Sequence, residues 1–248
     1  MNMDSRAGQY IEKLSDRLGL GEHSAVLIVG LGKTGYSIAQ FLSSQSIHFA
    51  VTDTRDAPPF LQEFREGFPD AAVFMGGFND TAFEAATHLV VSPGVPLDHP
   101  LIQSTRARGV PVVGDLDLFA AVVDVPVLAV TGANGKSTVT TLLGLMANAD
   151  GRQARAGGNL GTPMLDLIDE SIEMYVLELS SFQLESSHLL EPLVATVLNI
   201  SPDHMDRYPD LEAYALAKER IFHGEGVMVL NRDDSRVAAM AKPGRQVA

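Results

Sequence analysis

The sequence predicts an α/β protein made of two consecutive domains, each built around a parallel sheet. Three observations support this fold class. Short runs of β-branched residues alternate with segments of helical periodicity from residue 25 onward, the pattern of parallel strands joined by crossover helices. Two glycine-rich loops each follow an apolar run and precede a helical segment. The chain has 248 residues, 46% of them hydrophobic, which is enough for two ordinary domains.

The first domain is expected to be doubly wound, with five strands. The strand candidates are 25–29, 48–53, 71–75, 89–92 and 110–113, and helices fill the gaps at 34–44, 80–86, 98–108 and 115–123. The Pro-rich stretch Ala57–Pro59 indicates a loop after the second strand. The boundary is placed near Asp124–Pro126, which gives domains 1–124 and 125–248.

The second domain repeats the alternation with fewer elements. Its candidates are strands at 126–131, 174–179, 193–199 and 227–231 and helices at 135–149, 210–222 and 235–241. A sheet of only about four strands looks half-built, because both faces of a parallel sheet need cover. We therefore expect a truncated domain in a fragment of a longer protein, with a small natural domain as the alternative.

Composition excludes several classes of protein. The net charge of −13 argues against a basic nucleic-acid-binding module. The absence of cysteine excludes disulfides, thiolate zinc sites and a cysteine nucleophile, and it fits a reducing compartment. No apolar run approaches the roughly 20 residues of a membrane span, and residues 1–24 lack the apolar stretch of a signal peptide. We expect a cytoplasmic protein without nucleic-acid partners or membrane insertion.

The first glycine-rich loop has the spacing of a nucleotide-binding turn. Gly30, Gly32 and Gly35 follow an apolar run and open a helical segment, so the backbone can approach a pyrophosphate at a helix N-terminus. Asp53 ends the next strand 18 residues after Gly35, where an acid usually meets a ribose hydroxyl. The alternative is a glycine turn that serves only helix packing.

The second loop resembles a phosphate-binding P-loop. Its sequence is Thr131-Gly-Ala-Asn-Gly-Lys-Ser-Thr138, in which Lys136 would reach the terminal phosphates and Ser137 would bind magnesium. The regular spacing requires glycine where this chain has Val130, so the loop is shorter than the standard motif. A dehydrogenase has no use for this second loop, and a simple ATPase has none for the first. Together the loops indicate an enzyme that handles a nucleotide-linked substrate and consumes a nucleoside triphosphate.

Polar residues follow the later strands of the second domain. Glu178 ends an apolar strand, and Asp203, His204 and Asp206 come just after another, at the sheet edge where α/β proteins bind ligands. Carboxylate oxygens and imidazole are suitable metal ligands. Exposed strand ends and helix-capping loops are the alternatives. Glu185 is expected on a helix surface, and by spacing alone Lys218 is an ordinary solvated lysine.

Four segments in order resemble the Mur ligase family of bacterial peptidoglycan synthesis. They are Thr131–Thr141, Gly157–Gly161, Leu177–Glu185 and Asp203–Tyr208, and the similarity spans about residues 25–232. The resemblance implies a Rossmann-like N-terminal domain followed by a truncated P-loop-type α/β central domain. It also implies an ATP-dependent amide ligase. Among the family, the motifs are most similar to members that add D-glutamate to UDP-N-acetylmuramoyl-L-alanine through an acyl phosphate. This activity belongs to cell-wall biogenesis, and so to cell shape and division.

The resemblance also assigns roles to individual residues. ATP would be held by Gly132, Asn134, Gly135, Lys136, Ser137 and Thr138. Mg²⁺ would be held by Ser137, Glu178, His204 and Lys218, the last as a carbamylated lysine. The UDP-sugar would contact Lys33, Thr34, Asp53, Thr54, Arg55, Ser92, Pro93 and Gly94, with Asn159 and His204 nearer its reacting end. Lys136, His204 and Lys218 would be the catalytic residues.

The resemblance leaves one part of the family pattern unmatched. Family members continue into a longer central domain and a third domain that supplies most of the D-glutamate site. We therefore expect this chain to lack that C-terminal domain and to be inactive alone. Two other classes stay open: an NAD-dependent oxidoreductase, which leaves the second loop unused, and a noncatalytic UDP-sugar-binding module.

Overall fold

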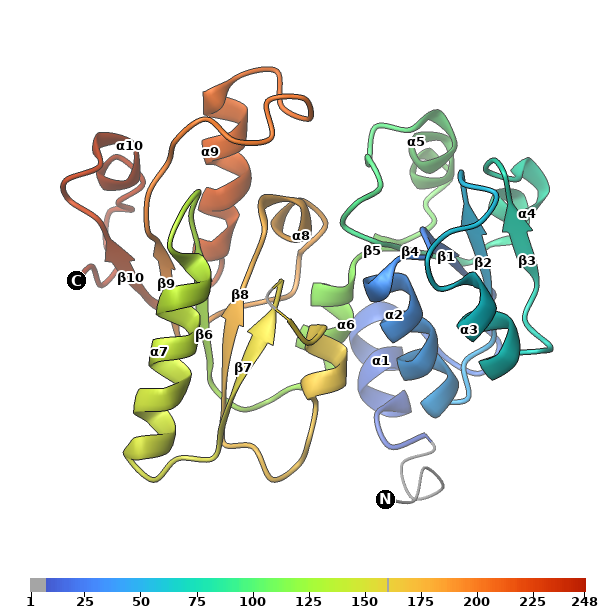
Figure 1. The fold of residues 1–248 in the computed structure, drawn as a ribbon, viewed down its shortest axis with the longest axis horizontal. Coiled ribbons are helices and arrows are strands. Elements are labelled where there is room, and N and C mark those ends of the chain that lie inside the picture. The colour runs from blue at the N-terminus through green and yellow to red at the C-terminus, as the bar shows by residue number, and fades with distance from the viewer. Residues whose placement is uncertain (1–7, 160) are drawn as a thin grey trace. The chain divides into compact units, whose positions relative to one another are not determined.

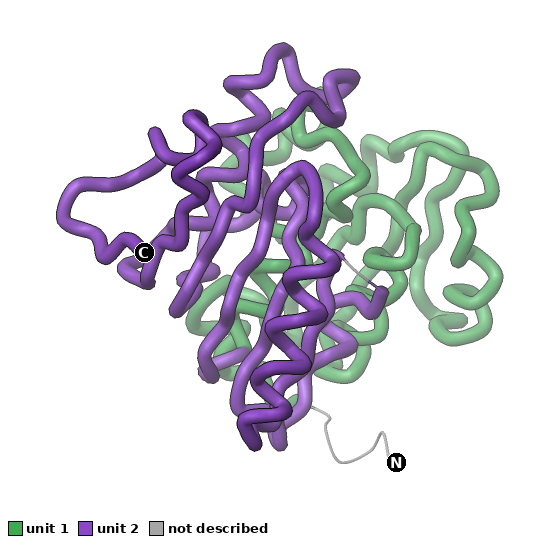
Figure 2. The backbone as a smooth tube through the Cα atoms, turned by 60° about the vertical axis from the view of Figure 1, so that its left-hand side comes forward, with its two compact units in different colours: residues 1–122 green, residues 123–248 purple. Residues whose placement is uncertain are grey.

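The computed structural model describes residues 8–159 and 161–248. The first part of the segment examined for a signal peptide therefore lies outside the described residues. The chain divides into two compact units, the first ending at Val122 and the second beginning at Val123 (Figure 2). Each unit contains its own parallel five-stranded sheet, and each is described by itself.

The sheet of the first unit has the strand order β3-β2-β1-β4-β5 (Figure 1). Its strands are β1 (Val26–Val29), β2 (Phe49–Asp53), β3 (Val73–Met75), β4 (His88–Val91) and β5 (Val112–Val113). The chain builds outward from β1 to β3 and then returns to the other side of β1. The strand order thus reverses between β1 and β4, and ligands of such sheets bind at the carboxyl edge beside this reversal.

The helices of the first unit are α1 (Ile11–Leu18), α2 (Lys33–Ser44), α3 (Leu61–Gly67), α4 (Asp80–Ala85), α5 (Pro100–Ala107) and α6 (Asp115–Val122). All four residues of β1 are buried, as a parallel strand covered on both faces requires. Leu27 and Val29 pack with Phe83, Leu89 and Ile102 in one core cluster. The five expected strands and four expected helices are confirmed to within a few residues.

Sequence analysis missed two short helices of this unit, α1 and α3. Both helices are short, and each buries a single residue of its own, Leu14 and Phe64. α1 is held by tertiary contacts instead. The Lys13 Nζ donates to the Val122 carbonyl at 3.0 Å and the Arg17 guanidinium donates to the Ala120 carbonyl at 3.0 Å. These cations satisfy carbonyl groups at the C-terminus of α6.

The sheet of the second unit has the order β10-β9-β6-β8-β7. Its strands are β6 (Val127–Thr131), β7 (Ala154–Gly158), β8 (Met174–Glu178), β9 (Val194–Val197) and β10 (Val227–Leu230). The helices are α7 (Lys136–Ala149), α8 (Ser181–Glu185), α9 (Leu211–Glu219) and α10 (Ser235–Ala238), with 3-10 turns at Met164–Leu167 and Arg220–Phe222. The central strand β6 lies between β8 and β9, so the loops after these three strands meet at one edge.

The expectation of about four strands in this sheet was wrong. The missed strand is β7, whose sequence Ala-Arg-Ala-Gly-Gly contains no β-branched residue. It forms because β8 offers a parallel partner over its whole length, from Ala154 opposite Met174 to Gly158 opposite Glu178. Glu185 lies on a helix as expected, at the end of α8, and the expected helix 210–222 divides into α9 and a 3-10 turn. Long-range pairing therefore overrides a weak local preference.

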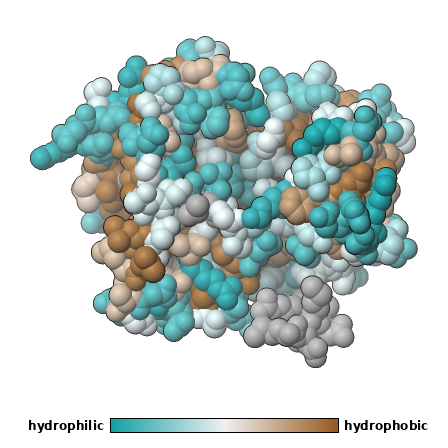
Figure 3. Space-filling model, in the orientation of Figure 1, coloured by the Kyte–Doolittle hydropathy of each residue, from teal (hydrophilic) through white to brown (hydrophobic). Residues whose placement is uncertain are grey.

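Helix α7 packs inward through small residues and carries exposed apolar side chains on its outer side. Thr140 and Gly144 face inward, and a side chain on Gly144 would approach the Ala156 Cβ to 2.9 Å. On the outer side, Leu142, Leu145 and Met146 are 54%, 63% and 58% exposed and contribute to the hydrophobic patch over α7 in Figure 3. No helix in the described part of the chain is long and apolar enough to cross a membrane.

Candidate active site

The carboxyl edge of the second sheet gathers the residues that the motifs single out. The loop after β6 leads into α7, Glu178 ends β8, and Gly158 ends β7 beside it. The segment after β9 carries Asp203 and His204. This edge is also the place where the strand order reverses, which is where open α/β sheets bind ligands.

The phosphate loop is shaped by two glycines with positive φ. Gly132 has a φ of 153° and Gly135 a φ of 81°, backbone conformations that other residues rarely adopt. The Lys136 Nζ donates to the carbonyls of Gly132 at 3.0 Å and Ala133 at 3.1 Å. No side chain caps the N-terminus of α7, so its first N–H groups are available to an anion.

Glu178 connects the phosphate loop to the end of β7. Its side chain is 2% exposed, and it accepts hydrogen bonds from the Ser137 hydroxyl at 2.8 Å and from the Asn159 carboxamide at 2.8 Å. The Asn159 backbone N–H also donates to the Glu178 carbonyl at 2.9 Å. A side chain on Gly158, which has a φ of 106°, would lie 2.5 Å from that carbonyl oxygen. The glycine is therefore required by the close approach of the two strands.

Lys218 is buried, which corrects the interpretation from spacing alone. It lies on α9 and is 2% exposed, with its Nζ 3.3 Å from the Thr131 hydroxyl and 4.6 Å from the centre of the Tyr214 ring. The Thr131 hydroxyl donates to the Leu179 carbonyl at 2.7 Å, which leaves its lone pairs for Lys218. Burial, and then repulsion from Lys136, lowers the pKa of Lys218 from 10.5 to about 7, against the attraction of Asp203 and Glu178.

His204 has a strained backbone, and its contacts differ from those that join Ser137, Glu178 and Asn159. Its φ is 55°, a left-handed conformation that is uncommon outside glycine. The His204 Nε2 lies 3.6 Å from the Asp203 carboxylate, and its ring centre lies 4.8 Å from that of Phe182. The side chain is 46% exposed. The structure thus joins Ser137, Glu178 and Asn159 directly, whereas His204 and Lys218 make contacts of their own.

The donor set fits magnesium bound together with a phosphate. Ser137 and Glu178 provide hard oxygen ligands side by side at the head of α7. Within the described residues, no group of three or more His, Asp or Glu side chains is arranged to hold a metal ion. Mg²⁺ is usually held by one or two carboxylates plus substrate phosphates and water, so this sparse set is suitable.

The first unit presents the expected UDP-binding residues at the carboxyl edge of its sheet. Lys33 and Thr34 begin α2 after β1, Thr54 and Arg55 follow β2, and three residues follow β4: Ser92, Pro93 and Gly94. The Ser92 hydroxyl donates to the Gly30 carbonyl at 2.8 Å. A side chain on Gly35 would collide with that same carbonyl oxygen, so the loop and the helix need glycine there.

Asp53 is buried, and both of its carboxylate oxygens are in use. It is 3% exposed and accepts the Leu31 N–H at 2.7 Å, the Arg55 N–H at 2.9 Å and the Arg55 guanidinium at 2.8 and 2.7 Å. Burial alone would raise the pKa of Asp53, but the hydrogen bonds from Arg55 and Leu31 outweigh it and lower the pKa. Asp53 therefore fixes the Gly-rich loop and the Arg55 side chain in place.

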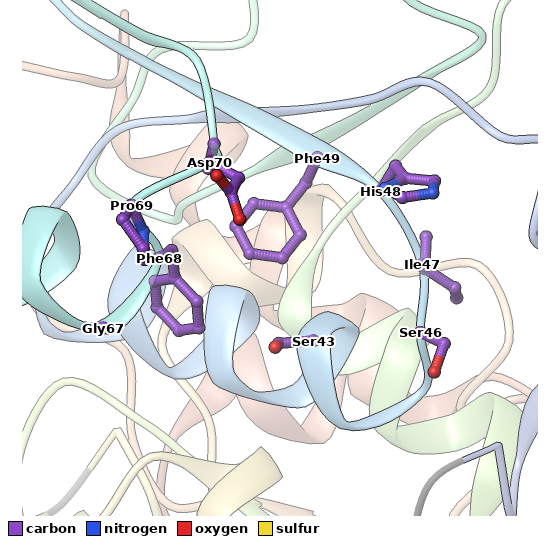
Figure 4. A pocket seen from close by; sticks show the side chains of 10 residues that line it. Ser43, Ser46, Ile47, His48, Phe49, Gly67, Phe68, Pro69 and Asp70 are labelled. Carbon is purple, nitrogen blue, oxygen red and sulfur yellow. The ribbon is translucent and has the colours of Figure 1, made fainter.

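A surface hollow of about 410 Å³ lies away from these edges (Figure 4). It is lined by the ends of α2 and α3 and by the start of β2, among them Ser43, Phe49 and Phe68. Asp53 ends β2 at the opposite edge of the sheet. The hollow is thus separate from the residues that the motifs predict.

Two residues that contact the site were not assigned a role from the sequence. Thr131 holds the Lys218 amine, and Asn199 hydrogen bonds to the backbone of Asn134. Their positions, at the end of β6 and just beyond the end of β9, were the available signal, because residues at the carboxyl ends of parallel strands gather at the ligand-binding edge. Their partners are 87 and 65 residues away in sequence, so the contacts themselves are visible only in the fold.

These features define a nucleotide-binding α/β protein with a P-loop-type phosphate site. The MurD-like N-terminal domain of Mur ligases matches residues 24–114, and the Mur ligase middle domain matches residues 130–247. The chain belongs to the Mur ligase family. The family resemblance and the α/β fold class expected from the sequence are therefore confirmed.

Curated relatives share high identity with this chain. The UDP-N-acetylmuramoylalanine--D-glutamate ligase of Methylococcus capsulatus is 63% identical over 230 residues, which cover 93% of this chain and 50% of the relative. The ligase of the same name from Nitrosococcus oceani is 56% identical over 220 residues, covering 88% and 49%. The chain thus spans about half the length of the curated relatives it matches.

Solved structures of more distant proteins share the fold. The murein peptide ligase of Psychrobacter arcticus aligns with a TM-score of 0.55 at 16% identity, covering 90% of this chain and 52% of that chain. The UDP-N-acetylmuramate-alanine ligase of Thermotoga maritima aligns with a TM-score of 0.53 at 19% identity, covering 89% and 52%. At this identity the likeness concerns the fold alone.

Proposed function

We propose that this chain provides the UDP-sugar-binding and ATP-binding parts of an amide ligase that adds D-glutamate to UDP-N-acetylmuramoyl-L-alanine. The observation that carries the proposal is the meeting of Lys136, Ser137 and Glu178 at the carboxyl edge of the second sheet. The identity of 63% with a ligase of this name supports the choice of substrates. Such a reaction uses precursors of the cell wall and belongs in the cytoplasm.

In the proposed reaction, the γ-phosphoryl group of ATP passes to the substrate carboxylate. The neutral amine of D-glutamate then attacks the acyl phosphate. An amide bond forms as the nitrogen loses one proton, the acyl–phosphate bond breaks, and inorganic phosphate leaves with the displaced electron pair. The phosphoryl-transfer state is loose and highly anionic, so catalysis consists mainly of positioning and charge neutralisation. Magnesium held by Ser137 and Glu178 would neutralise charge on the phosphates.

Different residues of the second unit would bind the phosphates, the metal ion and the UDP-sugar. Gly132, Asn134, Gly135 and Thr138 form the loop and first turn that would surround the phosphates, and the Lys136 ammonium would leave its two carbonyl partners to contact them. Asn159 holds the Glu178 carboxylate and would face the reacting end of the UDP-sugar. His204 would complete the metal and substrate contacts from the segment after β9. These assignments follow the family pattern, and their positions at one sheet edge support them.

Lys218 would act in a modified form. Its buried amine is held by Thr131, and a pKa of about 7 leaves a large neutral fraction at neutral pH. A neutral amine can add to carbon dioxide, forming an N–C bond and releasing a proton. The product is a carbamate, whose negative oxygens suit a magnesium ligand.

The first unit would select UDP and not a dinucleotide. A dinucleotide enzyme uses the acid at the end of its second strand to accept ribose hydroxyls. Here that acid is Asp53, and its oxygens already accept hydrogen bonds from Leu31 and Arg55. Arg55 is therefore the group that faces outward, beside Thr54. Its side chain is 52% exposed.

Calorimetry tests the proposal on this chain. We expect binding of UDP-N-acetylmuramoyl-L-alanine, competition by UDP but not by NAD, and separate binding of Mg·ATP. Lys136→Ala should abolish ATP binding, because it removes the compact positive charge at the head of α7, and should leave UDP binding intact. Tighter binding of NAD than of UDP, or unchanged ATP affinity in Lys136→Ala, contradicts the proposal.

A further inference from the structure

The segment after β9 supports the phosphate loop through one side chain. Asn199 lies two residues beyond the end of β9, and its Oδ1 accepts the Asn134 N–H at 2.9 Å. Its Nδ2 donates to the Asn134 carbonyl at 3.0 Å. One carboxamide thus satisfies both backbone polar groups of a single loop residue, as a neighbouring β-strand would.

Backbone contacts between the phosphate loop and the segment after β9 add to these two hydrogen bonds. Together they form a clamp on residues 133–134. The Ala133 N–H donates to the Asn199 carbonyl at 3.0 Å. A side chain on Gly132 would lie 3.1 Å from the Leu198 Cβ and 3.3 Å from the Asn199 backbone nitrogen, so the two segments are in close contact. Three hydrogen bonds therefore hold residues 133–134, between the two positive-φ glycines where the loop has the most freedom to change shape.

The clamp determines which loop groups can face a phosphate. The Asn134 N–H is occupied by Asn199, so the donors left for an anion are those at the start of α7. The carbonyls of Gly132 and Ala133, which hold the Lys136 ammonium, belong to the same clamped stretch. A loop held in one conformation binds its ligand without a further loss of conformational freedom.

We infer that Asn199 is a positioning residue that holds the phosphate loop in the shape that receives the nucleotide. The inference rests on the proposed function of that loop. Asn199 acts through Asn134 and Ala133, and no contact of its own with the nucleotide is required. The inference thus adds Asn199 to the site, a residue that the sequence motif of the phosphate loop does not include.

The matched comparison is between Asn199→Ala and Ser201→Ala. Ser201 lies on the same segment and accepts only the Asn134 side chain, at 3.3 Å, so its removal leaves the backbone clamp intact. In calorimetry with Mg·ATP, we expect Asn199→Ala to bind about tenfold more weakly than the unchanged chain. Ser201→Ala should stay within about twofold. Affinity for UDP-N-acetylmuramoyl-L-alanine and the melting temperature should be nearly unchanged in both variants.

Amide exchange measured by NMR provides a readout without nucleotide. The Asn134 N–H should exchange faster in Asn199→Ala than in the unchanged chain, and Ser201→Ala should leave it protected. If Asn199→Ala does not fold, Asn199→Asp replaces it. This variant has nearly the same volume and keeps an acceptor for the Asn134 N–H, but it loses the donor to the Asn134 carbonyl. It should bind ATP more weakly with that N–H still protected.

The outcomes separate the two proposals. If the unchanged chain binds no Mg·ATP, the proposed function fails, and the exchange rates alone decide whether Asn199 holds the loop. If the unchanged chain binds Mg·ATP and Asn199→Ala binds it equally well with a protected Asn134 N–H, the inference about Asn199 is overturned. A loss of ATP affinity together with UDP affinity and melting temperature would also overturn it, because that pattern indicates general destabilisation.

Discussion

Burial changes the chemistry of single residues in each of the two units. Lys218 and Asp53 are both nearly inaccessible, but their surroundings act on them in opposite ways. Lys218 faces a hydroxyl and an aromatic ring, and its burial disfavours the cation more than the attraction of Asp203 and Glu178 favours it. Asp53 is held by a guanidinium and backbone N–H groups, so its anion is favoured despite burial. Burial with different neighbours thus produces a reactive amine at Lys218 and a stable ion pair at Asp53.

We expect Lys218 to make the stability of the second unit depend on pH. Its folded pKa of about 7 lies below the ordinary 10.5, so the unfolded chain binds more protons between these values and stability rises with pH across this window. The full effect is of the order of a few kcal/mol. Urea unfolding from pH 6 to 10 in bicarbonate-free buffer measures it. Lys218→Met should lack this rise, and parallel curves for the two proteins would contradict the prediction.

The Arg55 side chain should contribute to the affinity for UDP-N-acetylmuramoyl-L-alanine and not to the affinity for ATP. Arg55→Ala removes the guanidinium that pairs with Asp53, raises the pKa of Asp53 and frees the loop after β2. Affinity for UDP-N-acetylmuramoyl-L-alanine should fall about tenfold or more, since hydrogen bonds between charged groups contribute about 1.5–3 kcal/mol. Arg65→Ala, which removes an exposed arginine on α3, is the matched control and should leave the affinity unchanged. Equal losses in both variants would point to net charge as the cause.

At the scale of elements, strand β7 shows how a weak local sequence is made into a strand by its neighbour. Its glycines allow β7 to lie against the end of β8, where Asn159 then holds Glu178 by backbone and side chain. A glycine also allows helix α7 to pack closely, because Gly144 lets the helix approach Ala156 on β7. Small residues therefore bring the phosphate loop, β7 and β8 close enough for Ser137, Glu178 and Asn159 to meet.

Gly158→Ala should destabilise the second unit more than Gly151→Ala. Both glycines have positive φ, of 106° and 83°, but only Gly158 has a neighbour that an added Cβ would strike, the Glu178 carbonyl oxygen at 2.5 Å. Backbone strain alone contributes about 1 kcal/mol in either variant, and the collision adds about 1–3 kcal/mol at position 158. Chemical denaturation of the two variants measures the difference. Equal losses of stability in the two variants would contradict the prediction, because they would show that β7 can move away from the Glu178 carbonyl at little cost in free energy.

At the scale of the whole molecule, each unit has a five-stranded sheet of its own. The reversal of strand order falls between β1 and β4 in the first unit and beside β6 in the second, and each reversal carries one nucleotide-type loop. Each unit also buries its own apolar residues, from Leu27 to Ile102 in the first and from Val127 to Met240 in the second. One chain thus carries two glycine-rich loops at the edges of two separately built sheets.

We expect the two units to fold when expressed separately. Residues 1–122 should unfold cooperatively and bind UDP-N-acetylmuramoyl-L-alanine, and residues 123–248 should do the same with Mg·ATP, because each contains its own core and loop. Circular dichroism and calorimetry on the separate pieces test this. An unfolded piece, or a folded one that loses its ligand, would show that the units depend on each other.

The sequence by itself determined the α/β class, the alternation of strands and helices, the two glycine-rich loops and the family. These depend on local periodicity and on short motifs, in which a few adjacent residues carry the signal. Only the tertiary structure decided the burial of Lys218, the pairing of Asp53 with Arg55, the fifth strand of the second sheet and the clamp of Asn199 on Asn134. The physical reason is distance along the chain: Lys218 meets Thr131 across 87 residues, Asn199 meets Asn134 across 65, and β7 needs β8 as its partner. Arg55 is only two residues from Asp53, but their pairing depends on a buried carboxylate that the Leu31 N–H, 22 residues away, helps to hold.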